Sequence, residues 1–432
     1  MLRVGCRYGA EVTSPADAAA DVTPGDGAAE ATHAIQLPNF RLLWTNSTAF
    51  MVLMNAQRFV IAWFVLDGLD RSEADQGLVV FALGVPTIFL TMHAGVWADR
   101  WKRKRLLFGS QLAMFASMAG LFVLAALDEA NFTWVLIMSV LAGSAMAVGG
   151  PVRQSLVPAI VPRSLIFSAV GLTAIGATVS MMLGPVLARG AGSIAGFEGA
   201  FGFLVLLVVI GLAVLIPLQV PEHVTATEAR PVRTDLAEIV RWVIDNPPFR
   251  KLVLLLTFAG MTIMPLSMVL MQAHVKEEFG RDSGDAAYAL ATMGLGVAVM
   301  SFYVMKKGSL PNKGGWFMCA MMLGGTVVAL MGLTTALWQL VILGFFMGLG
   351  GGVYMNMSQG LFQTHTPQEL MGRMMALFSL TMGGVMPVCA LIYGFVAEEV
   401  GTGPTTFFGG LACLAVALVA FLTDRSGLKT LT

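Results

Sequence analysis

Residues 95–105 read GVWADRWKRKR, a stretch in which one carboxylate, Asp99, is followed by five cations within six positions. It ends one long apolar run and precedes another that begins near residue 106. Lysine and arginine close to the ends of membrane helices concentrate on the cytoplasmic side. We therefore interpret 99–105 as a short cytoplasmic loop that joins two membrane-spanning helices.

The composition of the whole chain indicates a membrane protein. Hydrophobic residues make up 56% of the 432 residues and charged residues 12%, whereas soluble domains carry about 25% charged residues. The 26 basic and 26 acidic residues leave no net charge. A nucleic-acid partner is not expected, because binding to the phosphate backbone requires an excess of basic residues on one face.

Apolar runs long enough to cross a bilayer, about 20 residues, recur between charged or Pro/Gly-rich breaks. We predict an all-α membrane protein with twelve transmembrane helices in two six-helix halves. The expected spans lie near 42–66, 76–98, 106–127, 133–156, 166–188, 200–219, 251–273, 286–305, 315–334, 337–361, 373–396 and 404–423.

The charges between these runs predict that both termini face the cytoplasm. The segments placed inside hold most of the cations, namely residues 100–105 and Arg41, Arg153, Arg163, Arg230, Arg233, Arg241, Arg250, Lys251, Lys306, Lys307, Lys313, Arg373, Arg425 and Lys429. The segments placed outside hold only Arg71, Lys276 and Arg281 with many acids, namely Asp67, Asp70, Glu73, Asp75, Asp128, Glu129, Glu198, Glu277, Glu278, Asp282, Glu398 and Glu399.

An internal repeat supports the division into halves. GPVRQSLVPAIVPRSL (150–165) aligns with MNMSQGLFQTHTPQEL (355–370) and matches Gln154 with Gln359, as expected for the parallel repeats of secondary transporters. We expect five segments: a disordered cytoplasmic tail (1–38), the N-terminal half (39–219), a cytoplasmic linker with an amphipathic helix (220–250), the C-terminal half (251–424) and a cytoplasmic tail (425–432).

The loop between spans 2 and 3 resembles the GxxxDRxGRR pattern of the major facilitator superfamily. Gly95, Asp99, Arg100, Arg103 and Lys104 fall on this pattern, while Trp101 and Lys102 stand at its "xG" positions, so that the loop glycine is missing. The resemblance covers essentially all of 39–424. It implies the major facilitator fold, transport by alternating access and a multi-pass protein of the bacterial inner membrane.

Four further stretches are similar to the subfamily of bacterial siderophore and macrolide exporters. They are NFRLLW (39–44), LVPAIVPRSL (156–165), GP (184–185) and TPQELMGRMMALFSL (366–380). This similarity implies export of a small drug-like or siderophore-like compound.

The resemblance also gives Asp99 a role. Gly95 would allow a neighbouring helix to approach span 2 closely, and the Asp99 carboxylate would face the positive N-terminal end of span 11, at Gly372 and Arg373. Together with Arg100 and Arg103 these residues would form a conformational latch that closes the cytoplasmic side in the outward-open state. The alternative is a weak surface ion pair between Asp99 and Arg100 or Arg153.

A second group of candidates lies inside the predicted spans, where ionisable residues are costly and often functional. Arg58 shares a helix face with Asn55 at i, i+3. Its guanidinium either binds an anionic or hydrogen-bonding group of a substrate, or extends to the outer interface, or hydrogen-bonds backbone carbonyls. Further polar residues either face a central cavity or bridge helices: Asn46, Gln57, Gln111, Gln272, Asn356, Gln359 and Tyr393. Methionines 261, 264, 268 and 271 follow one face of span 7 and suit an adaptable apolar lining or simple packing.

Other intramembrane residues receive structural interpretations. Arg189 is expected to extend to the outer interface, and His93 and His274 to be hydrogen-bonded packing residues. Gly184 and Pro185 are expected to bend span 5.

The predicted spans contain no Asp or Glu, so proton coupling would require Asp99, a histidine or a carboxylate at a helix end. No nucleophile–base pair, metal-ligand cluster or phosphate loop is found in the sequence. We therefore expect no enzyme, cofactor or metal.

The function expected from the sequence is secondary active export of a small amphipathic or hydrophobic compound, with proton antiport as one energy source. The partners would be this substrate, protons and the lipid bilayer, and the protein would be a monomer. An importer or lipid flippase on the same fold is the first alternative, and a membrane receptor or assembly factor without transport is the second.

Overall fold

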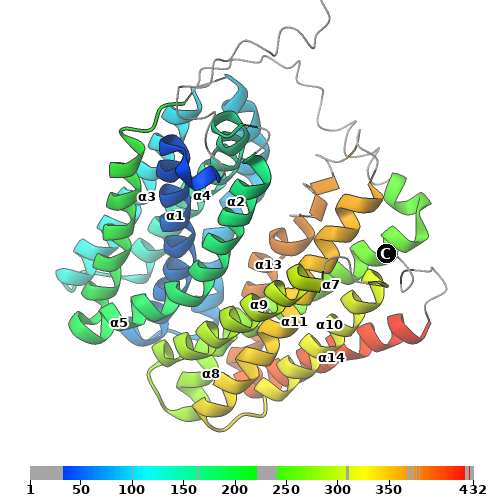
Figure 1. Ribbon diagram of the computed structural model, residues 1–432. Helices are drawn as coiled ribbons and strands as arrows, with labels where there is room; N and C mark the ends of the chain where they lie inside the picture. The colour runs from blue at the N-terminus through cyan, green and yellow to red at the C-terminus, as the bar shows by residue number, and fades with distance from the viewer. Residues whose placement is uncertain are drawn as a thin grey trace, which may run out of the picture.

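The computed structural model describes residues 33–100, 102–162, 165–220, 241–307, 311–366, 370, 374–375, 377–378, 380–423 and 428, with the side chains of 91–100, 155, 158, 159, 167, 170, 382 and 383 excepted. This part of the chain is almost entirely helical and has no strand (Figure 1). The elements are η2 (Ala34–Gln36), α1 (Pro38–Trp63), η3 (Phe64–Gly68), α2 (Glu73–Arg100), α3 (Arg103–Ala126), α4 (Phe132–Ile160), α5 (Ile166–Leu215), α7 (Pro247–Met268), α8 (Leu270–Phe279), η5 (Ser283–Asp285), α9 (Ala286–Lys307), α10 (Lys313–Met331), α11 (Leu337–His365), η7 (Leu380–Gly384), α13 (Met386–Val400) and α14 (Thr402–Leu422).

Within the described residues, ten helical segments are long and apolar enough to cross a membrane. One of them, Gly171–Leu215, covers the two predicted spans 5 and 6. Its helix is interrupted at Ala195 and Gly196, where Gly196 has a φ of 60° that favours glycine. Predicted span 11 (373–396) corresponds to η7 and α13, and residues 373, 376 and 379 near its start lie outside the described part. The arrangement is therefore consistent with twelve crossings in an all-α membrane fold.

The helices form two bundles (Figure 1). In one, α1 packs along α5, α2 along α4, and α3 against α4 and α5; in the other, α9 packs along α11 and α10 along α14 and α11. The first bundle comes from Pro38–Leu215 and the second from Pro247–Leu422. The expected amphipathic helix of 220–250 lies mostly outside the described residues.

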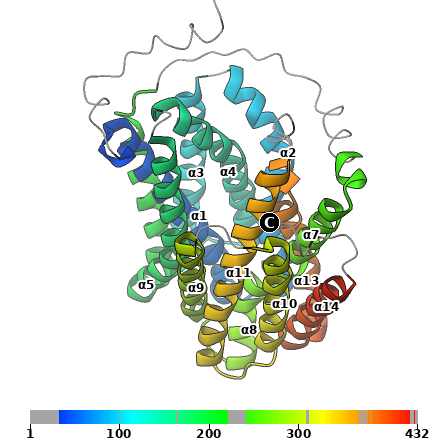
Figure 2. The same cartoon turned by 45° about the vertical axis from the view of Figure 1, so that its right-hand side comes forward.

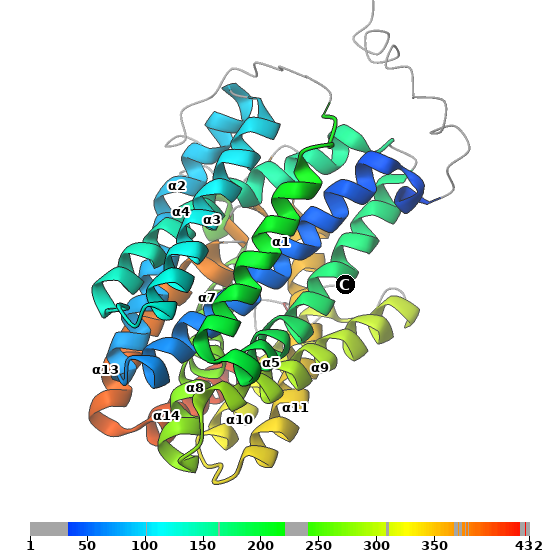
Figure 3. The same cartoon turned by 90° about the vertical axis from the view of Figure 1, so that its left-hand side faces the viewer.

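The bundles meet along two helix pairs, α2 with α13 and α5 with α9 (Figures 2 and 3). Glycines allow the close approach: a Cβ at Gly84 would lie 2.0 Å from Pro387 Cγ, one at Gly77 would lie 2.7 Å from the Ala390 carbonyl oxygen, and one at Gly294 would lie 2.9 Å from Met182 Cα. A side chain at these positions would push the bundles apart. We call these two helix pairs the seam.

The seam lies towards one end of the molecule. Its glycines fall in the first half of α2 and of α9, close to the connections around residues 69–72 and 280–285. We call this the outer end, because the charge distribution predicts that it faces away from the cytoplasm. The opposite, inner end holds the predicted latch.

Candidate functional site

A central cavity lies between the two bundles, beside the seam, because Val80 of α2 and Met386 of α13 belong to its lining. It consists of two adjoining pockets, which enclose about 620 Å³ (the larger) and 570 Å³ (the smaller) of space between atoms, including space open to solvent. The two pockets share Met181, Met268 and Met293 as lining residues. The lining comes from α1, α2 and α5 of one bundle and from α7, α9, α10, α11 and α13 of the other.

The polar part of this cavity is formed by α1. Asn55 and Arg58 both line the smaller pocket, as their i, i+3 spacing predicts. Asn55 Nδ2 donates to the Met51 carbonyl of its own helix (2.9 Å). The Arg58 side chain is exposed, and within the described part of the chain no hydrogen bond or ion pair holds its guanidinium.

The opposite wall of the cavity is rich in methionine. Six methionines line the larger pocket, namely Met181, Met264, Met268, Met293, Met347 and Met355. The hydroxyl groups on this wall are bonded to backbone carbonyls: Ser267 Oγ donates to Ile263 (2.6 Å) and Tyr354 Oη to Leu256 (3.2 Å). Of the predicted methionine face, Met264 and Met268 line the cavity, whereas Met271 is buried and Met261 is exposed elsewhere.

Ion pairs between the bundles close the outer end of the cavity. Lys276 of α8 lies 2.8 Å from Asp70 Oδ1 and 3.7 Å from Asp67 Oδ1 and also donates to the Leu66 carbonyl. Asp67 in turn accepts hydrogen bonds from the backbone N–H and the hydroxyl of Ser283 (2.8 and 2.6 Å). The hydrogen bond and the charge of Lys276 lower the pKa of Asp70 below its ordinary value.

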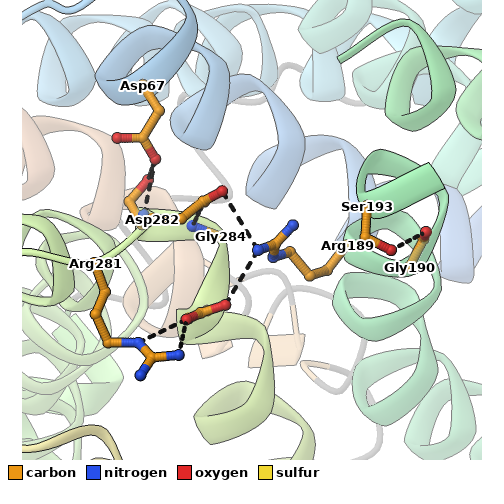
Figure 4. A network of polar contacts seen from close by, with 9 residues as sticks. Asp67, Arg189, Gly190, Ser193, Arg281, Asp282 and Gly284 are labelled. Atoms are coloured by element: carbon orange, nitrogen blue, oxygen red, sulfur yellow. Dashed lines mark hydrogen bonds and ion pairs between the residues drawn. The ribbon is translucent and has the colours of Figure 1, made fainter. Parts of the chain in front are cut away.

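A reciprocal set of ion pairs involves Arg189 of α5 (Figure 4). Its Nη2 lies 3.2 Å from Asp285 Oδ1 and 3.3 Å from Asp282 Oδ2, and its guanidinium stacks 5.0 Å from the Trp63 ring. Arg281 holds the other oxygen of Asp285 at 2.8 Å. We call Asp67, Asp70, Arg189, Lys276, Asp282 and Asp285 the outer gate.

The structure differs here from the expectation that Arg189 extends to the lipid interface. The carboxylates of the connection between α8 and α9 are close enough to pair with it, and the Asp285 side chain is only 9% exposed. The sequence assigned the outer acids and Lys276 to the outer side of the membrane, but it did not identify which of these residues pair. One sequence feature could have predicted these ion pairs: each half has a basic residue at its outer end, and the other half has acids at the same end.

Buried amides connect the bundles below the gate. Gln272 Nε2 of α8 donates to the Phe59 carbonyl of α1 (3.0 Å), and Gln272 Oε1 accepts from Gln76 Nε2 of α2 (3.2 Å). Gln76 Nε2 also donates to the Val269 carbonyl (3.0 Å). Gln272 was expected either to face a central cavity or to bridge helices, and in the structure it bridges helices. Gln76 was not predicted.

A second buried network lies within the N-terminal bundle. Arg153 Nε donates to Asn46 Oδ1 (2.9 Å), and Asn46 Nδ2 donates to the Gly211 carbonyl (2.8 Å). With its amide oriented so that Nε2 faces Gly211, Gln111 accepts from Arg153 Nη2 (3.0 Å). Asn46 and Gln111 thus bridge α1, α3, α4 and α5 and do not line the two pockets. Arg153, expected at a wet inner surface, is buried.

The remaining predicted cavity residues are scattered. Gln57 is fully buried, and its amide nitrogen and oxygen have no hydrogen-bond partner among the described residues. Asn356 donates to Ser301 Oγ (3.1 Å) inside the C-terminal bundle, Gln359 is exposed, and Tyr393 packs partly buried against the core. None of the four lines the two described pockets.

His274 and Gly184 have structural contacts. The two ring nitrogens of His274 lie within hydrogen-bond distance of Thr402 Oγ1 and Thr334 Oγ1 (3.2 and 3.0 Å), which fits the packing interpretation.

A Cβ at Gly184 would lie 3.0 Å from the Val52 carbonyl oxygen, so this glycine lets α1 approach α5. Pro185 lines the cavity. The backbone of α5 stays helical at both residues and departs from helical geometry only at Ala195 and Gly196.

The predicted latch can be placed only in part. Gly95, Asp99 and Arg100 lie in the last turns of α2, where the structure describes the backbone but not the side chains. Arg103 is the first residue of α3. Gly372 and Arg373 lie outside the described residues, as does the side chain of His93. The latch therefore stays a prediction.

Solved structures with the same fold include two transporters. The peptide transporter POT matches with a TM-score of 0.73 at 14% identity and covers 91% of this chain and 95% of its own. The nucleoside transporter NupG matches with a TM-score of 0.71 at 13% identity, over 89% of this chain and 99% of its own. At these identities the similarity concerns the fold alone.

Curated relatives include two exporters. The multidrug efflux pump Tap of Mycolicibacterium fortuitum is 24% identical over 380 residues, 84% of this chain and 90% of that protein. The enterobactin exporter EntS of Shigella boydii serotype 18 is 25% identical over 371 residues, 82% of this chain and 85% of that protein. These relatives are transporters and not enzymes. The family model described as Major Facilitator Superfamily matches residues 43–333 and 252–431. The chain therefore belongs to the Major Facilitator Superfamily.

Proposed function

We propose that this protein is a secondary active transporter that exports small amphipathic or hydrophobic compounds by alternating access. The observation that carries this proposal is a cavity between two bundles that are joined by ion pairs at one end. Asp67, Asp70 and Arg189 of the first bundle pair with Lys276, Asp282 and Asp285 of the second at the outer end. This arrangement supports an inward-open state in which the outer gate is closed.

The lining of the cavity supports an apolar or amphipathic substrate. Methionine side chains are flexible and polarizable and adapt to irregular apolar shapes, and the C-terminal wall has its hydroxyl groups already bonded. The names of the relatives, a multidrug efflux pump and an enterobactin exporter, support outward transport. We further propose that the protein lies in the inner membrane of a bacterium as a monomer, with both termini in the cytoplasm as the distribution of Lys and Arg predicts.

Alternation between two states requires a second closure at the inner end. The predicted latch, in which Asp99 meets the start of predicted span 11 near Gly372 and Arg373, supplies it. The outer gate would then open when the latch forms. The rigid seam of α2 with α13 and α5 with α9 would serve as the fulcrum between the two states.

For the energy source we propose proton antiport. None of the residues that line the two described pockets is Asp, Glu or His. The proton would therefore bind at a carboxylate whose surroundings change between the states, namely Asp99 of the latch.

The experiment is an accumulation assay in sealed inverted vesicles with a panel of amphipathic compounds, with and without an imposed pH gradient. Wild type is compared with Asp99→Asn, and Asp128→Asn in an exposed outer loop serves as the matched control. Gradient-driven accumulation that is lost in Asp99→Asn but kept in the control is the expected result. Absence of accumulation across the panel would contradict export. Normal accumulation in Asp99→Asn would contradict the latch.

A further inference from the structure

We infer that the substrates of this cavity are amphipathic organic anions and that Arg58 binds their anionic group. The inference rests on the proposed function as a transporter, but it does not depend on the direction of transport or on the coupling ion. It concerns the chemical class that the cavity recognises.

The first observation is that Arg58 has no counter-charge among the residues that the structure describes. Among the residues that line the two described pockets, Arg58 is the one charged side chain. Every basic residue of the outer gate, by contrast, is paired with at least one carboxylate. Because Arg58 is exposed and lines the cavity, its guanidinium is accessible to an anionic partner that arrives from outside the protein.

The second observation concerns the hydrogen-bonding groups that Arg58 and its neighbour Asn55 present to the cavity. The guanidinium offers several N–H donors in a planar fork that matches a carboxylate, sulfonate or phosphate. Asn55, on the same helix face, uses one amide N–H on the Met51 carbonyl and keeps its oxygen for a neutral polar group. A positively charged ligand would find no carboxylate on the described walls of the cavity and would be repelled by Arg58.

The third observation is that this polar corner adjoins the methionine wall. Met181, Met268 and Met293 belong to the linings of both pockets. A molecule whose anionic group lies at Arg58 can therefore extend its apolar part directly among the methionines. The cavity thus fits a compound with one anionic end and an apolar body.

Arg58 is also adjacent to a contact that holds the bundles together. Its neighbour Phe59 accepts the hydrogen bond of Gln272 across the two bundles (3.0 Å). An anion bound to Arg58 would therefore lie one residue along α1 from the hydrogen bond between Gln272 and the Phe59 carbonyl, which joins the two bundles.

The test compares the binding of two dyes that differ by one sulfonate: 8-anilinonaphthalene-1-sulfonate and uncharged N-phenyl-1-naphthylamine. Binding to the purified full-length protein is measured from the rise in its unfolding temperature with dye concentration. The variants are Arg58→Gln and Arg58→Lys, and Arg71→Gln at the outer surface is the matched control. The ligand-free unfolding temperature of each variant verifies that it folds.

Wild type and Arg71→Gln are expected to bind the sulfonate more tightly than the uncharged dye. Arg58→Gln is expected to lose about tenfold or more of its affinity for the sulfonate, as for a charge-assisted hydrogen bond, with the uncharged dye unaffected. Arg58→Lys should keep part of the preference. Equal discrimination by wild type and Arg58→Gln, or no preference for the anion in wild type, would overturn the inference.

The vesicle assay distinguishes this inference from the proposed function. Export of cationic compounds that is insensitive to Arg58→Gln would refute the anion site and leave export standing. An anion preference that depends on Arg58, without transport in the vesicles, would refute export and leave the anion site standing.

Discussion

Arg189 Nη2 of the N-terminal bundle lies 3.2 Å from Asp285 Oδ1 of the C-terminal bundle. Lys276 of the C-terminal bundle forms the reciprocal pair with Asp70, at 2.8 Å. Each bundle thus supplies a cation to the acids of the other at the outer end. Pairs of this kind hold the bundles together only while both partners are charged and in register, and a transporter must break them to open outwards.

Neutralising Arg189 or Asp285 should open the outer gate. The side chains are 18% and 9% exposed, so we expect the pair to be worth at least the ~1 kcal/mol of good exposed pairs, or about a fivefold shift in population. The measurement is the labelling rate, by an impermeant thiol reagent added from outside, of Ala62→Cys below the gate, in a chain whose four native cysteines are replaced.

Arg189→Gln and Asp285→Asn should each raise this labelling rate, and the double variant should raise it by less than the product of the two. Multiplicative effects would show that the two residues act independently. Arg71→Gln, which removes a cation paired within its own bundle, should leave the rate unchanged.

Gly84→Ala should impair transport because it disturbs the packing of the seam. The added Cβ would lie 2.0 Å from Pro387 Cγ, so α2 and α13 could not keep their close approach. The matched control is Gly109→Ala in α3, where, apart from the chain neighbours and the backbone of α3 itself, no described atom lies within 4 Å of the added carbon. Transport in inverted vesicles should fall in the first variant and persist in the second. Equal activity in both would show that the close approach of α2 and α13 is dispensable.

The pH dependence of the gate follows from the lowered pKa of Asp70. Closure through the Asp70–Lys276 pair is fully stabilised above the ordinary pKa of about 3.9. It is lost as the outer pH falls through the lowered pKa. The effect should be small, because Asp70 is 91% exposed.

Thiol labelling itself slows as the thiolate is protonated, so the labelling rate of Ala62→Cys is divided by the rate measured at the same pH with Asp70→Asn added. This ratio should stay constant between pH 6 and 8 and should rise only below about pH 4. In Asp70→Asn the pair is absent at every pH, so the rate should start higher. A change of this ratio near neutral pH would contradict the lowered pKa of Asp70.

Asn46→Ala should destabilise the N-terminal bundle. It leaves Arg153 Nε without its acceptor and the Gly211 carbonyl without the Asn46 donor, and an unsatisfied buried polar group costs about 1–3 kcal/mol. Asn55→Ala is the control, since Asn55 bonds only a carbonyl of its own helix. The unfolding temperature of the purified protein should fall clearly for Asn46→Ala and little for Asn55→Ala. Similar values for both would indicate that the buried network contributes nothing to stability.

The helices were predictable because bilayer thickness imposes a length and an apolar character on every crossing. Local spacing also placed Asn55 and Arg58 on one face. The spacing on α1 could not show that Asn46 and Gln57 are buried, because burial depends on which helices surround each face. The same limit applies to Arg153, whose partners come from α1 and α3.

The outer gate could not be derived from the sequence for a related reason. Arg189 and Asp285 are 96 residues apart, and they meet only because α5 packs against α9. The sequence correctly assigns acids to the outer loops on average, but charge counting does not identify pairs. Gln76 shows the same limit, since its partners, Gln272 and the Val269 carbonyl, belong to the other bundle.

Alternating access is tested most directly by measuring distances between spin labels at both ends of the protein. One pair is placed outside, at Glu129 and Thr335, and one inside, at Gln154 and Gln359. All four side chains are exposed. In Arg189→Gln, relative to wild type, the outer distance should lengthen while the inner distance shortens in the same fraction of molecules. Unchanged distances in both pairs, or lengthening at both ends together, would contradict transport by alternating access.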